Sequence, residues 1–242
     1  MTTHKAGGRS PRFGGRTSVY FFATLVTVLM SVLSPRLFAQ ASSEFHSTRI
    51  GLSAGMGVNY HNAQDIVNRI NGSSIITQRV ADFKSGVEFF GAISVPLSTD
   101  WAVKAEYVYL FASYTQGTIF GGNAEFSYAV HMPTLIGQYI LYEASTYNFK
   151  VGVGCGYHFG SYSERYSLVD ETFTGKGLGT LIELEGNTAL GEDLYAHLGA
   201  QMRWDFIGDL KNSAGNSPSG ATGTTSLHFF SVGARLGMSY YF

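Results

Sequence analysis

Cysteine, proline and charge are all scarce in this chain. Its 242 residues include one cysteine, Cys155, and five prolines, and only 14% of the residues are charged. A single cysteine excludes an internal disulfide and a zinc site built from cysteines. It also excludes a lipoprotein, which needs a cysteine at its new N-terminus. Aromatic residues and 30 glycines are abundant instead, which is not the composition of an ordinary cytosolic enzyme.

The first forty residues have the layout of a targeting segment. An uncharged apolar run over Val19–Leu33 ends at Pro35, and Ala39-Gln40-Ala41 is a small-x-small cleavage site. The run is about 15 residues long, against the roughly 20 that a transmembrane anchor needs. We therefore predict a signal peptide over residues 1–41. Its basic n-region comprises Lys5, Arg9, Arg12 and Arg16.

Residues 42–242 form one predicted mature domain. Without residues 1–41 the chain keeps 11 Lys and Arg against 17 Asp and Glu, a net charge of −6. An acidic domain argues against nucleic acid as a partner.

Apolar and polar residues alternate with a period of two through most of this domain, and no later run is long enough for a membrane helix. In the last segment one face is apolar and the other is small or polar. The apolar face carries Phe230, Val232, Ala234, Leu236, Met238, Tyr240 and Phe242. Such alternation is typical of a membrane β-barrel.

The pattern predicts an all-β fold, an eight-stranded antiparallel up-and-down transmembrane β-barrel in the bacterial outer membrane. Strands are expected at 47–60, 83–97, 101–115, 124–141, 147–160, 173–190, 194–207 and 226–242. Tight turns alternate with long polar loops, which are expected at 61–82, 115–123, 161–172 and 208–225. Short turns of such barrels face the periplasm and long loops face outward.

With the apolar faces toward lipid, acids and bases collect on the inner faces in nearly equal number. These residues are Arg49, Lys84, Glu88, Lys104, Glu106, Lys150, Glu183, Glu185, Arg203, Asp205 and Arg235. Buried charges persist when they are paired and hydrogen-bonded, and an eight-stranded bore is narrow enough for side chains to fill. We predict a closed, ion-paired lumen and no open pore.

The C-terminal stretch from Val232 resembles the terminal strand by which outer-membrane proteins are recognised for assembly. Its alternating positions Leu236, Met238, Tyr240 and Phe242 carry the resemblance. The resemblance implies the barrel assembly machinery as a transient partner.

The segment 124–141, with Tyr128-Ala129-Val130-His131-Met132-Pro133-Thr134-Leu135-Ile136, resembles the proline-containing strand of the outer-membrane β-barrel domain family that includes PorT-like proteins. The general form is similar to small barrels of the OmpA and OmpX type. This resemblance implies a fold and a membrane but no single activity.

Two groups of residues are candidates for chemistry. His158, Ser161 and Glu164 loosely resemble the serine and base of a barrel lipid A deacylase, but alternation places Ser161 on the face opposite His158. His131, His158 and His197 are expected to point inward, where three imidazoles could bind a metal or simply join a hydrogen-bond network. The network is favoured, so we expect no catalytic residue, no metal and no cofactor.

Three further features have structural interpretations. Pro133 cannot donate to a strand ladder, which indicates a bulge or distortion in its strand. Cys155 alternates with apolar residues and should face lipid. Ile66, Val67 and Ile70 have helical spacing behind Asp65, which predicts a short amphipathic helical turn over the barrel mouth, whereas the Gly-, Ser- and Asn-rich loop 208–225 is expected to be mobile.

Three functions remain open. The first is a structural or interaction barrel that contacts an envelope or secretion protein through its loops or turns. The second is a narrow, porin-like channel or uptake barrel, suggested by glycines in the first and fifth strands: Gly51, Gly55, Gly57, Gly152, Gly154 and Gly156. The third is a lipid-modifying barrel enzyme that uses His158 and a nearby serine.

Overall fold

The computed structural model describes residues 49–144, 146–166, 169–218 and 225–242. The predicted signal peptide and the first residues of the predicted first strand lie outside these ranges. In the described ranges, no helix has the length and hydropathy needed to cross a membrane.

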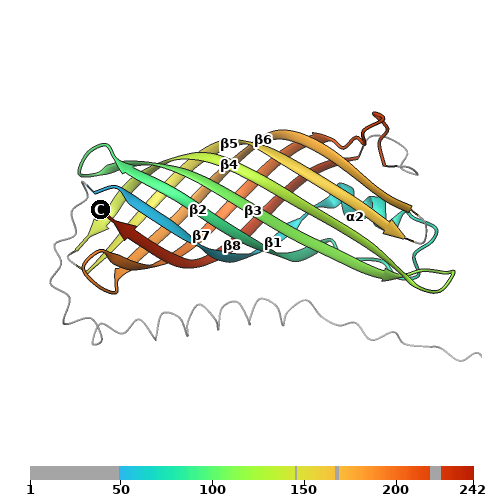
Figure 1. Cartoon of the computed structure of the whole chain (residues 1–242), viewed down its shortest axis with the longest axis horizontal. Coiled ribbons are helices and arrows are strands. Elements are labelled where there is room, and N and C mark those ends of the chain that lie inside the picture. Colours follow the sequence, from blue (N-terminus) through green and yellow to red (C-terminus); the bar gives the residue numbers. More distant parts are fainter. Residues whose placement is uncertain (1–48, 145, 167–168, 219–224) are drawn as a thin grey trace, which may run out of the picture. The chain divides into compact units, whose positions relative to one another are not determined.

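Eight antiparallel strands close into a barrel in which each strand pairs with its neighbours in sequence and β8 pairs with β1 (Figure 1). This confirms the predicted fold class. The strands are β1 Gly51–Asn62, β2 Phe83–Pro96, β3 Trp101–Gly117, β4 Asn123–Glu143, β5 Tyr147–Tyr166, β6 Val169–Ala189, β7 Leu194–Asp209 and β8 Ser226–Tyr241, and one helix, α2 Gln64–Asn71, lies between β1 and β2.

The two ends of the barrel differ. At one end, which we call the turn end, tight turns follow β2, β4 and β6. Leu97 N donates to Trp101 O at 2.8 Å in the first of them, and Leu190 N donates to Leu194 O at 2.8 Å in the third. At the other end, the loop end, lie α2 and the longer connections. Figure 1 shows the C-terminal end of β8 at the turn end and α2 at the loop end.

The alternation of faces is confirmed at the level of single residues. On β8 the Leu236 side chain is 63% exposed, whereas Ser239 on the opposite face is 3% exposed. On β1, Met56 and Val58 are more than half exposed, and the Asn59 side chain is buried. Cys155 is exposed on the outer face of β5, as predicted.

Toward the loop end the polarity of the two faces inverts. On β3 the outward residues change from Tyr107 and Phe111 to Ser113 and Thr115, while the inward side chain of Tyr114 is 2% exposed. Alternation continues through this region, but apolar residues now point inward. The outer surface near the loop end is polar, as expected of a wall in water. The remaining outer surface is apolar, as expected of a wall in lipid.

This inversion explains why the predicted loop 161–172 is wrong. β5 and β6 continue past it as one hairpin ladder, from Ser161 opposite Thr174 to Tyr166 opposite Val169. Its outward residues are polar, and in sequence alone such residues indicate a loop. The predicted loop 115–123 is likewise shorter, because β3 extends to Gly117 and β4 begins at Asn123.

Pro133 does not produce a bulge. The β4–β5 ladder has the same register before and after it, with His131 opposite Phe159 and Thr134 opposite Gly156. The register instead shifts between Ile140 and Tyr142, near the turn end. The distortion predicted at Pro133 is instead an interruption of the ladder: β4 and β5 form no pair at Met132 and Pro133, because proline has no N–H to donate.

Helix α2 forms where helical spacing predicts it, and it closes the loop end from inside. Ile66, Val67 and Ile70 are fully buried in one cluster with inward residues of the strands, including Phe126 and Tyr162. The polar face of the helix, including Asn68, is exposed. The predicted helical turn over the barrel mouth is therefore confirmed.

Candidate functional site

The lumen between α2 and the turn end contains a network of buried ion pairs. Its centre is Lys104, whose Nζ lies 2.7 Å from Glu183 Oε1, 3.0 Å from Glu185 Oε2 and 3.4 Å from Glu106 Oε2. All four side chains come from β3 and β6, which are not neighbouring strands. The network therefore crosses the bore and connects opposite walls.

Arginine extends the network to β2, β7 and β8. Arg235 Nε lies 2.5 Å from Glu88 Oε1, and its Nη1 lies 2.7 Å from Glu106 Oε2. Arg203 Nη2 approaches the other oxygen of Glu106 at 3.5 Å. Because Glu106 receives both guanidinium groups and the Lys104 ammonium, it joins the two parts of the network.

Neutral amides add hydrogen bonds to carboxylates that the bases already contact. Gln138 Nε2 donates to Glu183 Oε1 at 2.9 Å and to Glu185 Oε2 at 2.8 Å. Gln201 Nε2 donates to both oxygens of Glu88, at 2.9 and 3.0 Å. Such additional hydrogen bonds offset the desolvation cost of buried ion pairs.

The buried network is electrically balanced. Its four bases are Lys104, Lys150, Arg203 and Arg235, and its four acids are Glu88, Glu106, Glu183 and Glu185. Each of the eight side chains is at most 4% exposed. Sequence alternation placed all eight on inner faces, but their partners could not be derived, because cross-bore distances depend on strand tilt and side-chain reach.

Three residues predicted to join this network lie elsewhere. Arg49 lies at the turn end and donates to Asp193 Oδ1 and Tyr241 O, both at 2.6 Å. Lys84 lies 4.1 Å from the ring centroid of Tyr114, in a cation–π contact. Asp205 contacts His158 instead of a basic residue of the network. The first two lie at the ends of the barrel, because Arg49 precedes β1 and Lys84 is the second residue of β2.

His158 forms a hydroxyl–imidazole–carboxylate arrangement, but not with the serine that its sequence suggested. Its Nδ1 contacts Asp205 Oδ1, and its Nε2 lies 3.2 Å from Thr134 Oγ1. Ser161 faces outward, with its hydroxyl 3.5 Å from Ala129 O. Gly179 makes room for the ring, since a Cβ there would lie 2.1 Å from His158 Cε1.

This arrangement does not have the environment of a reaction site. Thr134 is 5% exposed, and His158 and Asp205 are each 1% exposed. Nucleophilic catalysis needs a substrate carbonyl beside the hydroxyl, whereas these groups lie within the packed lumen. We interpret them as part of the hydrogen-bonded filling.

The three-histidine metal hypothesis is wrong in its geometry. His131 is exposed on the outer wall, with Nδ1 2.5 Å from the Tyr107 hydroxyl, while His158 and His197 are buried inside. His131 faces outward because its neighbours Val130 and Met132 belong to the inner apolar cluster near α2. Within the described residues, no group of three His, Cys, Asp or Glu side chains has metal-binding geometry.

Polar contacts fasten α2 to the wall. Arg69 Nη2 lies 3.1 Å from Glu164 Oε2, and Glu164 also accepts a hydrogen bond from the Tyr162 hydroxyl at 3.0 Å. At the other end of the helix, the Ser226 hydroxyl donates to Asp65. The helix is therefore held to β5 and β8 as well as by its apolar face.

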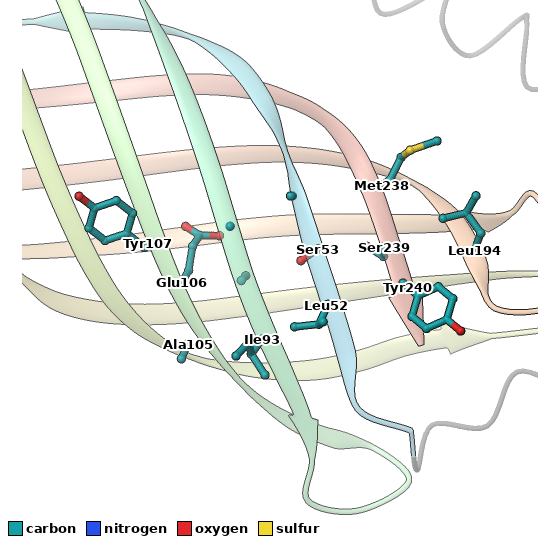
Figure 2. Close-up of a pocket in the computed structure, with 13 residues that line it drawn as sticks. Leu52, Ser53, Ile93, Ala105, Glu106, Tyr107, Leu194, Met238, Ser239 and Tyr240 are labelled. Atoms are coloured by element: carbon teal, nitrogen blue, oxygen red, sulfur yellow. The ribbon is translucent and has the colours of Figure 1, made fainter. Parts of the chain in front are cut away.

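The outer wall has a shallow depression of about 630 Å³ across β8, β1, β2 and β3, bordered also by Leu194 at the start of β7. Small residues, Ala54, Gly91 and Ala105, lie between larger apolar ones such as Leu52, Ile93 and Tyr240. Figure 2 shows several of these side chains on the neighbouring strands. Its position on the apolar exterior fits lipid chains. Glu106 and Ser239 also border it, but both residues are buried and their side chains lie on the inner faces of their strands.

The predicted C-terminal assembly signal lies on this exterior. Leu236, Met238, Tyr240 and Phe242 are between 46% and 63% exposed. Their recognition by assembly machinery stays a prediction.

No family model matches the chain, and no curated protein matches it, so the resemblance to PorT-like proteins stays a prediction. Among solved structures, the chain is similar to Ail, the attachment invasion locus protein of Yersinia pestis, at 9% identity, covering 80% of this chain and 98% of that one with a TM-score of 0.47.

Two further solved structures have the same level of similarity. Neisserial surface protein A is 10% identical over 80% of this chain and 97% of its own, with a TM-score of 0.47. OprG of Pseudomonas aeruginosa is 12% identical over 84% of this chain and 99% of its own, with a TM-score of 0.46.

The closed strand order and the apolar exterior define the chain as an eight-stranded β-barrel of the outer-membrane type. Within that class, it is a barrel whose described lumen is filled by a balanced ion-pair network and whose loop end is covered from inside by α2.

Proposed function

We propose that this protein is an integral outer-membrane barrel with a closed lumen, and that it acts as a structural or interaction component of the cell envelope through its loops and turns. The ion-paired filling of the bore carries the proposal. Lys104 reaches across the bore to Glu183 and Glu185, and α2 packs over the apolar cluster beyond them. Solute passage would require both layers to open.

The glycines that suggested a channel support a filled bore instead. A Cβ at Gly57 would lie 2.8 Å from Glu88 Oε1, and one at Gly152 would lie 2.9 Å from Glu183 Cγ. A Cβ at Gly156 would lie 2.8 Å from His158 Nε2. These positions are glycine because neighbouring groups occupy the space.

A lipid-modifying activity has little support. His158 is buried beside Thr134 and Asp205, and Ser161 points to the other side of the wall. Unchanged lipid A mass spectra after overexpression would remove this alternative.

The closed lumen can be tested by single-channel recording. The refolded mature protein should insert into planar bilayers without a large, stable conductance, and its migration on gels should change after boiling. A steady conductance from such heat-modifiable protein would contradict the closed lumen. A chain that fails to fractionate with outer membranes would contradict its location.

The interaction role needs a separate experiment. Crosslinking the tagged protein in intact cells, followed by extraction in mild detergent and mass spectrometry, should recover a specific envelope or secretion protein. Recovery of the assembly machinery alone would contradict an interaction role.

A further inference from the structure

A polar cluster lies on the outer wall at the edge of the apolar surface. On β5, β6 and β7 the last large apolar outward residues before the loop end are Phe159, Leu178 and Phe206, which are 46%, 62% and 55% exposed. The next outward residues on β5 and β6 are Ser161 and Lys176. In a membrane, this boundary would lie at the level of the lipid headgroups.

Strand register brings two lysines together at this boundary. Thr174 pairs with Lys211 through two backbone hydrogen bonds, Thr174 N to Lys211 O at 2.9 Å and the reverse at 3.0 Å. Opposed residues of an antiparallel pair share a face, and so do residues two apart on one strand. Lys176, Thr174 and Lys211 therefore all face outward, and Ser161 adjoins Thr174 from β5.

The two ammonium groups have no charge partner in the described part of the chain. No hydrogen bond or ion pair within it involves the side chain of Lys176 or Lys211. By contrast, Arg165 on the same wall pairs with Asp170 at 3.3 Å. Asp209 is exposed nearby, but it forms no ion pair with either lysine among the described contacts.

We propose that this lysine pair, Lys176 and Lys211, binds the phosphate of an anionic lipid headgroup in the outer leaflet. The hydroxyl of Thr174 lies beside the pair as a further donor, and the acyl chains would lie along Leu178 and Phe206. Basic residues at a membrane surface attract anionic headgroups. The inference rests on the proposed outer-membrane location.

The shape of the site favours a lipid over a free anion. The cluster is on the open outer wall with its residues exposed, so one side of a bound phosphate would remain in solvent. Two lysines on an exposed surface bind a small anion weakly because water and salt screen their charge. A lipid headgroup is held there as well by its chains on the apolar surface beneath.

Native mass spectrometry of the refolded barrel in uncharged detergent tests the site. The probe is a diphosphorylated lipid A, compared with the same lipid after phosphate removal and with inorganic phosphate. The diphosphorylated lipid should bind, and the double substitution Lys176→Gln with Lys211→Gln should weaken it about tenfold or more. The matched control, Arg79→Gln with Arg165→Gln, removes the same charge from exposed positions elsewhere and should retain binding.

A further variant works in the opposite direction. Asp209→Asn removes the nearby carboxylate and should strengthen binding. Equal binding of the dephosphorylated lipid, or full binding by the lysine double variant, would overturn the proposal. Displacement by inorganic phosphate at low millimolar concentration would assign the site to a free anion and would overturn the lipid assignment.

Failure of this inference can be separated from failure of the proposed function. The binding measurement uses detergent-solubilised barrel and does not depend on location in the cell. Outer-membrane fractionation and heat-modifiability of the lysine double variant report location and folding independently. A folded, outer-membrane protein that binds no phosphorylated lipid would overturn only the lysine-pair site.

Discussion

The two halves of the barrel have opposite polarity on their outer walls and in their interiors. In the half toward the turn end, the wall is apolar outside and the bore is filled by charges such as Lys104 and Glu183. In the half toward the loop end, the wall is polar outside, and Tyr162 and Phe173 pack inside against α2. The change from apolar to polar outward residues along the strands thus marks where the wall would pass from lipid into water.

The comparison also shows what each filling requires. Apolar packing is non-directional and tolerates adjustment, so one short helix can complete it. A charged bore needs every ion paired, because an uncompensated buried charge is costly. Glu106, which faces Lys104, Arg203 and Arg235, cannot lose its charge without leaving bases unmatched.

The largest expected loss of stability comes from removing a buried charge in the half toward the turn end. Lys104→Met should destabilise the barrel by about 3–5 kcal/mol, since Glu183 and Glu185 lose their shared cation while buried. Urea unfolding in lipid vesicles, followed by the gel shift on boiling, measures the loss. Lys176→Met, on the exposed wall, is the control and should change stability by less than about 0.5 kcal/mol. Equal effects would mean that the lumen charges are solvated.

The next effect tests the boundary between lipid and water. Leu236→Arg should cost about 2–4 kcal/mol, because it places a charge on the lipid-facing wall. Thr115→Arg also faces outward, but beyond the apolar surface, and should be close to neutral. Vesicle insertion and unfolding of the two variants give the comparison. Similar losses for both would place the boundary elsewhere.

A smaller, local loss of stability is expected in the half toward the loop end. Ile70→Ala should weaken the packing of α2 by about 2 kcal/mol without opening the barrel ladder. Limited proteolysis should cleave residues 63–82 faster, while heat-modifiability stays unchanged. Asn68→Ala, on the exposed face of the same helix, should leave the cleavage rate unaltered. Global unfolding by Ile70→Ala would show that the two halves are not independent.

The smallest effect concerns an ion pair outside the lumen. Arg165 and Asp170 have side chains that are 67% and 64% exposed, so Arg165→Gln should change stability by less than about 0.5 kcal/mol. Its neighbour Glu164 faces inward to Arg69, and Glu164→Gln should loosen α2 measurably in the same proteolysis assay. Equal behaviour would show that burial does not distinguish these neighbouring pairs.

The sequence predicted the barrel because residues of opposite polarity alternate with a period of two in every strand. It identified the outward face at Leu236 and the inward face at Lys104 correctly. The prediction is wrong where apolar residues face the interior and not the lipid. Val130 and Met132 are inside, so His131 is outside, and the polar residues near Ser161, which indicate a loop in sequence, lie on the outer face of a strand.

For the bore, the sequence predicts only that acidic and basic residues are nearly balanced. Nearly equal numbers of acids and bases on inner faces predict pairing, but not which pairs form. Lys104 and Glu185 are 81 residues apart, and their meeting depends on tilt and register. The contact of His158 with Asp205 and Thr134 depends on the space left by Gly179, which no local pattern reports.

The seam between β1 and β8 has a consequence for the order of assembly. Gly55 and Gly237 face each other there so closely that a Cβ on Gly55 would lie 2.6 Å from Gly237 Cα. This ladder joins the strands with the greatest sequence separation, and such contacts form slowly. The seam is therefore expected to be the kinetic bottleneck of folding, where substitutions such as Gly237→Val would trap an open sheet before they weakened a finished barrel.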